Sequence, residues 1–195
     1  MTSPASAKDR STLAYTYPDF RFFWLTTLCA SFAAQIMSVS VGWQIYDLTG
    51  EAYLLGLVGL AQFLPALCLV LITGLAADKF PRRRIIQIAL VAEVGCATGL
   101  LAFAGAQGHE VWPIFLILVV LGVARAFIGP SSSSLAPNLV PPQALANAIS
   151  MNVTAWQLAS ILGPVAGGLL YGISATVAYA VAGVLVLGAL ISISL

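Results

Sequence analysis

The chain has 195 residues, of which 60% are hydrophobic and only 8% are charged, and its formal net charge is +1. Soluble domains carry about a quarter of their residues as charged side chains, so this composition excludes a soluble globular protein. The balanced charge offers no basic face for phosphate groups, which argues against a nucleic-acid partner. The three cysteines lie in apolar runs without paired spacing and are interpreted as small buried hydrophobic residues. The single histidine, His109, has no partner at ligand spacing, so we expect neither a metal site nor a cofactor.

Residues 1–17 form a polar tail, and residues 18–195 contain six apolar segments in succession. Each segment reaches the roughly 20 residues that a helix needs to cross a hydrocarbon core ~30 Å thick. Turn and cap residues separate the segments, among them Gly50, Pro81 and the pair Pro141-Pro142. We therefore predict an all-α membrane protein with six transmembrane helices over Phe20–Tyr46, Tyr53–Ala77, Ile85–Ala106, Val111–Leu135, Ala144–Tyr171 and Ala175–Leu195.

The basic residues predict the orientation in the membrane. Seven of the eight lie before or at the start of the first segment or between the second and third, namely Lys8, Arg10, Arg21, Lys79, Arg82, Arg83 and Arg84. The loops on the other side contain neither lysine nor arginine. By the positive-inside rule, we expect a multi-pass protein of the cell (inner) membrane with both termini in the cytoplasm.

Two ionisable residues fall inside the predicted spans, Glu93 in the third and Arg125 in the fourth. At 1.5 Å per residue, Glu93 lies roughly 13 Å from the cytoplasmic edge and Arg125 about 10 Å from it, so the two could pair. A charge at the middle of a span costs about 2.5–3.5 kcal/mol on insertion scales and therefore needs a partner, protein or water. The pair is compatible with a structural ion pair, with an arginine that snorkels inward, and with a proton or substrate relay.

Polar residues recur at steps of three or four along the first, fourth and fifth segments and so share a face of each helix. The first contains Gln35 within such a seam, and the fifth contains Asn152. Seams of this kind are either close helix contacts or the wall of an aqueous cavity. The glycines in them favour packing, whereas Gln35, Asn152 and Arg125 favour a cavity wall.

Two clusters are more informative. The first runs from Gly74 through Asp78, Lys79, Arg82, Arg83 and Arg84 at the inner end of the second segment. Its arginines anchor the topology, but an anchor explains neither Gly74 nor the acid before the basic run. That acid could bond a neighbouring arginine or cap a helix N-terminus and so latch one conformation.

The second cluster is Gly163-Pro164-Val-Ala-Gly167-Gly168 in the fifth segment. A proline in mid-span removes a backbone hydrogen bond, and the glycines around it leave a smooth face. The cluster therefore predicts a bent helix that a neighbouring helix can pack against or slide over.

Together these residues resemble the amino-terminal half of a major facilitator superfamily transporter. The first cluster is similar to the loop signature Gly-x-x-x-Asp-Arg/Lys-x-Gly-Arg-Lys/Arg, with Pro81 in place of the second glycine. Leu121-x-x-x-Arg125-x-x-x-Gly129 is similar to the signature of the fourth helix, with Ile128 where a glutamine is usual. The cluster in the fifth segment matches Gly-Pro-x-x-Gly-Gly, a signature associated with exporters. The stretches 20–25 and 43–50 look like the enterobactin-exporter-like and macrolide-efflux-like branch.

The resemblance implies 3+3 inverted repeats, proton-coupled efflux of small amphipathic molecules of the drug or siderophore type, and alternating access. Asp78 with Arg82 or Arg83 would form a conformational latch, to which Gly74 and Lys79 also belong. Arg125, with Glu93, would take part in proton coupling. The residues from Gly163 to Gly168 would shape the interface that moves.

Members of that family have twelve helices, whereas this chain ends after six. We expect a fragment that lacks the carboxy-terminal half of the transporter, the alternative being a natural half-transporter that pairs with a second copy. An importer or a uniporter of the same family, and a non-transporting half that only binds a partner helix bundle, also remain possible. An intramembrane enzyme would need a nucleophile beside a base, and no predicted span contains a histidine, so we expect no enzyme.

Overall fold

The computed structural model describes residues 13–106 and 110–195, so that Lys8, Arg10 and His109 lie outside the described part of the chain. It contains six helices that are long and apolar enough to cross a membrane, which confirms the all-α membrane fold. They are α2 (Pro18–Thr49), α3 (Ala52–Lys79), α4 (Arg82–Gly105), α5 (Trp112–Leu135), α6 (Leu145–Ile173) and α7 (Ala175–Ser194). One short 3₁₀ turn, η1 (Ala14–Thr16), precedes them, and two others, η2 (Ala136–Asn138) and η3 (Pro142–Ala144), join α5 to α6.

The helix boundaries follow from local chemistry. Pro18 begins α2, where its fixed φ suits the first turn and its missing N–H is not needed. The same helix continues to Thr49, beyond the predicted end at Tyr46. It ends there because the next residue, Gly50, adopts the left-handed conformation (φ 68°) that commonly terminates helices. The hydroxyl of Ser174 accepts a backbone N–H at the start of α7 and separates that helix from α6.

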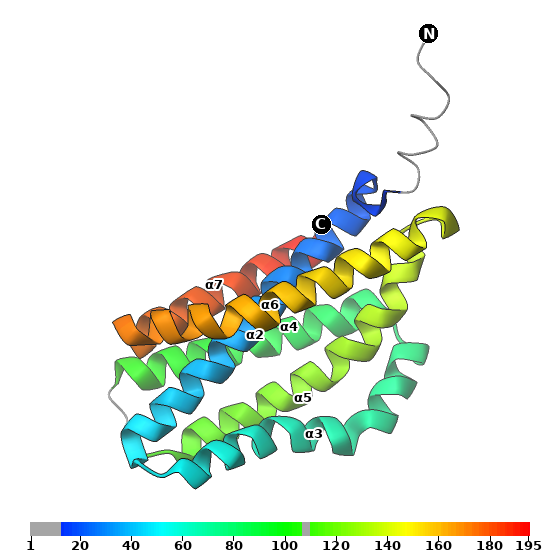
Figure 1. The fold of residues 1–195 in the computed structure, drawn as a ribbon. Helices are drawn as coiled ribbons and strands as arrows, with labels where there is room; N and C mark the ends of the chain where they lie inside the picture. The colour runs from blue at the N-terminus through cyan, green and yellow to red at the C-terminus, as the bar shows by residue number, and fades with distance from the viewer. Residues whose placement is uncertain (1–12, 107–109) are drawn as a thin grey trace.

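Successive helices run in opposite directions, and Figure 1 shows their turns gathered at two ends of an elongated bundle. The start of α2, the turn from α3 to α4 and the connection from α5 to α6 lie at one end. We call it the basic end, because it contains Arg21, Lys79, Arg82, Arg83 and Arg84. The turns from α2 to α3 and from α6 to α7 lie at the opposite end.

The contacts between helices reproduce the symmetry of an inverted repeat. The main neighbours are α2 with α6 and α7, α5 with α3 and α4, and α4 with α7. Exchanging α2 with α5, α3 with α6 and α4 with α7 turns this set of contacts into itself. The first three helices and the last three are therefore packed in equivalent ways, as two inverted three-helix repeats are.

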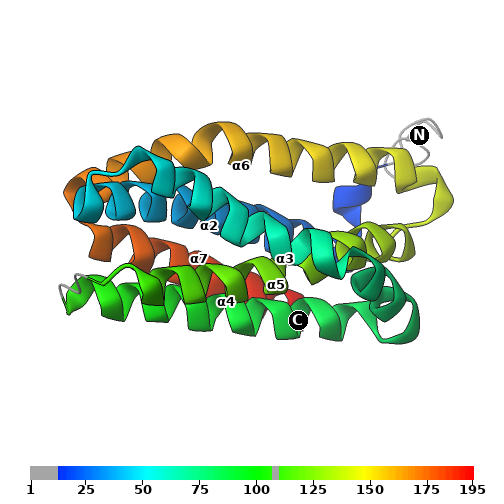
Figure 2. The same cartoon turned by 90° about the horizontal axis from the view of Figure 1, so that it is seen from below.

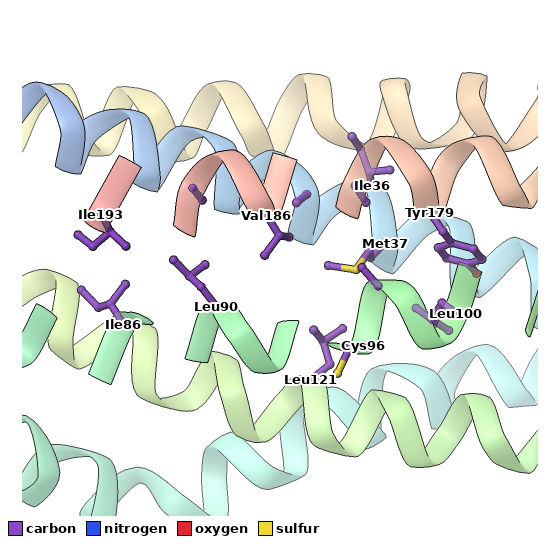
Figure 3. Close-up of a cluster of buried hydrophobic side chains, with 14 of the residues drawn as sticks. Ile36, Met37, Ile86, Leu90, Cys96, Leu100, Leu121, Tyr179, Val186 and Ile193 are labelled. Carbon is purple, nitrogen blue, oxygen red and sulfur yellow. The ribbon is translucent and has the colours of Figure 1, made fainter. Parts of the chain in front are cut away.

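The apolar core lies mainly between α2, α4, α5 and α7, where Figure 3 shows the side chains of Leu90, Leu121 and Val186 among others. Helix α3 is far less covered than the others. In its most apolar 18-residue stretch 6% is buried, whereas the corresponding share in α4 is 44%. This exposure corrects the interpretation of the cysteines, because Cys96 on α4 is buried whereas Cys68 on α3 is exposed.

Candidate functional site

An ion pair lies inside the bundle, between α4 and α5. Arg125 Nε donates to Glu93 Oε1 at 3.2 Å, which is the pairing expected from the depths of the two residues in their spans. Glu93 lies on the face of α4 that also carries the buried residues Leu90 and Ala97. Its carboxyl group is therefore surrounded by core, whereas the Arg125 side chain remains 24% exposed.

The same arginine also reaches two further helices. Its Nη1 donates to Gln62 Oε1 on α3 at 3.0 Å, and its Nη2 donates to the backbone carbonyl of Ala34 on α2 at 3.3 Å. One guanidinium thus joins α2, α3, α4 and α5 at a single level of the bundle. Gln62 was not among the residues predicted for the site, although a lone amide in the long apolar run of the second segment was a signal for it.

A glycine brings α3 close enough for this network. A Cβ added to Gly122, three residues before Arg125, would lie 2.5 Å from the backbone oxygen of Gln62. Contacts that short do not occur, so only glycine permits α3 and α5 to approach here. The close contact places the Gln62 side chain beside the arginine that follows one turn later.

The network leaves one polar atom unpaired. The second carboxyl oxygen, Glu93 Oε2, is buried and has no hydrogen-bond partner among the described residues. Buried polar atoms are nearly always paired, so each exception requires an explanation. A carboxyl group that is held through one oxygen and free at the other can accept a proton without losing its contact to Arg125.

The glycines of the fifth span pack against the first. A Cβ added to Gly163 would lie 2.5 Å from Gln35 Cβ, and one added to Gly167 would lie 3.1 Å from Ile36 Cα. The polar seam of α2 and the glycine seam of α6 therefore face one another inside the bundle. Gln35 is half-buried at this contact, where we predicted a cavity wall, and both roles are compatible with its position.

Three other residues of α6 also belong to the predicted site. A Cβ added to Gly168 would meet nothing within 4 Å, so packing within these six helices does not explain a glycine there. Pro164, which lies within α6, is also only partly buried. Asn152 is half-buried, and its Oδ1 has no partner in the part of the chain that the structure describes.

The cluster at the basic end divides into two groups. Arg82 Nη1 donates to the Ser134 carbonyl at 2.8 Å, and Arg83 Nε donates to the Ile193 carbonyl at 2.6 Å. These carbonyls belong to the last turns of α5 and α7, where a cation complements the helix dipole. Asp78, by contrast, is exposed, and no described residue forms an ion pair or hydrogen bond with its carboxyl group.

The rest of that cluster is open on the surface. Lys79 is exposed, and a Cβ added to Gly74 would meet nothing within 4 Å. The structure thus brings Arg82 and Arg83 into contact with helix ends and leaves Gly74, Asp78 and Lys79 without a contact that would explain them. The latch between Asp78 and Arg82 or Arg83 stays a prediction.

Polar bonds at the opposite end join α2 to the last two helices. The Tyr179 hydroxyl donates to Gln44 Oε1 at 2.6 Å in a buried position, and the Tyr171 hydroxyl donates to Asp47 Oδ2 at 2.7 Å. These four residues were not among those predicted for a site, because only the tertiary structure brings them together.

The sequence of this chain is similar to a known protein family and to two efflux proteins. The family described as Major Facilitator Superfamily matches residues 23–195. Macrolide efflux protein A of Streptococcus pyogenes is 23% identical over 156 residues, which are 79% of this chain and 38% of that protein. Multidrug efflux pump Tap of Mycobacterium tuberculosis is 27% identical over 150 residues, which are 74% of this chain and 36% of that protein.

The chain therefore spans well under half the length of the relatives that it matches. The family match covers most of the chain, and the matched part contains all six helices, apart from the first residues of α2, and every residue of the charged network. The two relatives are transport proteins rather than enzymes. Because the family match covers most of its length, the chain belongs to the major facilitator superfamily.

Proposed function

We propose that this chain is the amino-terminal half of a proton-coupled exporter of small amphipathic molecules, of the drug or siderophore type, that works by alternating access. The names of two relatives, a macrolide efflux protein and a multidrug efflux pump, support export. The Gly163-Pro164-Val-Ala-Gly167-Gly168 sequence, which resembles an exporter signature, supports the same direction of transport.

The observation that carries the proposal is the ion pair between Arg125 and Glu93, whose other oxygen, Oε2, has no hydrogen-bond partner among the described residues. A transporter that exchanges substrate for protons needs a titratable group connected to the elements that move. Here Arg125 on α5 contacts three other helices, so a change in the charge of Glu93 alters a network of bonds that joins all four. Proton uptake by Glu93 would weaken the ionic bond and favour a second arrangement of the helices around Arg125.

We further propose that a second six-helix bundle covers the exposed faces of α3 and α6. These two helices are equivalent in the inverted repeat and are the least buried of the six. Gly74 on α3 and Gly168 on α6 have open space where a side chain would be, which suits close approach by another helix. Asp78 and Lys79 at the basic end form no ion pair within the described part of the chain and are then available to latch the two bundles together.

The basic end is proposed to face the cytoplasm, with both termini on that side of the cell membrane. To test this orientation, Cys29, Cys68 and Cys96 are replaced by serine, and a single cysteine is introduced at Tyr53 or at Phe80. A membrane-impermeant maleimide applied to intact cells should label the Tyr53→Cys variant at the opposite end and spare the Phe80→Cys variant. The reverse labelling would invert the topology.

Proton coupling is tested with the full-length transporter in inverted membrane vesicles that carry an imposed pH gradient. Glu93→Gln keeps the shape and the acceptor oxygen for Arg125 but can no longer exchange a proton. We expect this variant to lose substrate uptake driven by the pH gradient while it retains exchange of substrate for substrate. Glu51→Gln, which alters an exposed carboxyl group at the opposite end, is the matched control and should transport as the unmodified protein does.

The alternatives give different results in the same assay. Uptake by Glu93→Gln that still follows the pH gradient would remove the residue from the coupling mechanism. Uptake of substrate that never responds to the gradient, even in the unmodified protein, would indicate a uniporter, and movement in the opposite direction an importer. No transport by a stable full-length protein, together with co-purification of a second six-helix chain, would indicate a half that only binds a partner bundle.

A further inference from the structure

A groove opens at the basic end where α3 and α4 diverge. Although these helices are consecutive, they scarcely contact each other, because each packs on α5. Figure 2 shows them joined at their turn, with α5 beside both. The resulting groove has a volume of about 490 Å³, within the range of ~300–1,000 Å³ that is usual for ligand sites.

The walls of the groove are apolar and are formed by alanine, branched and aromatic side chains together with one proline. One stripe of α5, which includes Val120, Ala124 and Phe127, forms the floor, and one stripe of α4, which includes Ala89 and Ala92, forms a side. Eleven of the twelve lining residues carry no charge or polar side-chain group, and the twelfth is Arg84. The occupant that fits such a site is a long apolar group with one anionic end.

Arg84 differs from the two arginines before it. Arg82 and Arg83 donate to carbonyls at the ends of α5 and α7, so their charges are already used within the bundle. The Arg84 side chain is exposed, and within the described ranges its guanidinium has neither a hydrogen-bond nor an ion-pair partner.

We propose that this groove binds an acyl chain of an anionic phospholipid, whose phosphate contacts the guanidinium of Arg84. The basic end of a membrane-spanning bundle lies at the level of the lipid headgroups, and basic pockets between helices there suit anionic headgroups. The guanidinium supplies paired N–H donors for the phosphate oxygens. The apolar walls of the groove replace the contacts that the acyl chain would otherwise make with neighbouring lipids. The proposal is independent of transport and of the direction of transport.

The test is lipid binding to the purified, delipidated protein, measured by native mass spectrometry. Phosphatidylglycerol and phosphatidylcholine with identical acyl chains are titrated separately, so that only the headgroup charge differs. We expect phosphatidylglycerol to bind more tightly and Arg84→Gln to weaken it about fivefold, the usual contribution of one basic side chain near an anionic surface. Phosphatidylcholine binding should be unchanged by that substitution.

Two further variants separate the charge from the groove. Arg21→Gln removes an exposed arginine at the same end that does not line the groove and should leave both lipids bound as before. Ala92→Phe fills the groove and should weaken both lipids. Equal affinity for the two lipids, or an Arg84→Gln variant that binds phosphatidylglycerol as the unmodified protein does, would overturn the proposal. Unchanged phosphatidylcholine binding by Arg84→Gln also demonstrates that this variant is folded.

Discussion

Gly163 lies on α6 where any larger residue would collide with α2. A Cβ at this position would be 2.5 Å from Gln35 Cβ, an atom that cannot rotate away because it is attached directly to the backbone. Overpacking of a close contact typically costs about 1–3 kcal/mol, whereas replacing glycine by alanine in a helix gains up to ~1 kcal/mol. We therefore expect Gly163→Ala to lower the free energy of unfolding by about 1–2 kcal/mol.

The measurement is the midpoint of thermal unfolding of the full-length protein in detergent. For a cooperative unit of about 150–250 residues, such as this six-helix bundle, a loss of about 1–2 kcal/mol corresponds to a decrease of ~2–8 °C. Gly172→Ala is the matched control, because it makes the same substitution in the same helix at a position where a Cβ meets nothing within 4 Å. Its midpoint should be unchanged or slightly higher.

A second substitution tests the cause. In the double variant Gly163→Ala with Gln35→Gly, the atom that collides is removed, so part of the lost stability should return. The reasoning is refuted if Gly163→Ala unfolds at the same temperature as Gly172→Ala. Destabilisation that Gln35→Gly does not relieve would mean that the effect arises elsewhere on α6.

Two further predictions concern stability. Gly122→Ala should destabilise by about 1–3 kcal/mol, because the new Cβ would lie 2.5 Å from the Gln62 backbone oxygen; a midpoint of unfolding equal to that of the unmodified protein would contradict this close approach. Tyr179→Phe removes the donor to Gln44 Oε1 and leaves a buried acceptor unpaired, at a cost of about 1–3 kcal/mol. Tyr171→Phe, whose hydroxyl bond is exposed, should change the midpoint less, and an equal effect of the two would argue against burial as the cause.

The charged network shows how far sequence reasoning could go. Glu93 and Arg125 could be paired from the sequence, since each is a charge inside an apolar run and the depth of each follows from its distance along the chain. Their contacts with Gln62 and Ala34 could not be predicted, because these depend on which helices are neighbours and how they are rotated. The number of residues from the end of a span determines how deep a residue lies in the membrane. The direction in which that residue faces depends on how its helix is rotated, which follows only from packing.

The glycines illustrate the same distinction. The sequence indicates small residues at Gly74, Gly163 and Gly168 and hence faces where helices come close. It does not say which face meets which helix. The structure assigns Gly163 to the contact with α2 and leaves Gly74 and Gly168 open, so their surroundings in the fold differ.

By itself, the sequence determined that the chain spans a membrane six times and carries its positive charge at one end. Those properties depend on the length and hydrophobicity of each segment, which are local. Only the tertiary structure decided that Arg82 and Arg83 bond to helix ends while Arg84 lines a groove, and that one arginine joins four helices. In a bilayer, an apolar side chain has nearly the same free energy against lipid as against another helix. Close packing and a few polar bonds therefore decide which helices become neighbours.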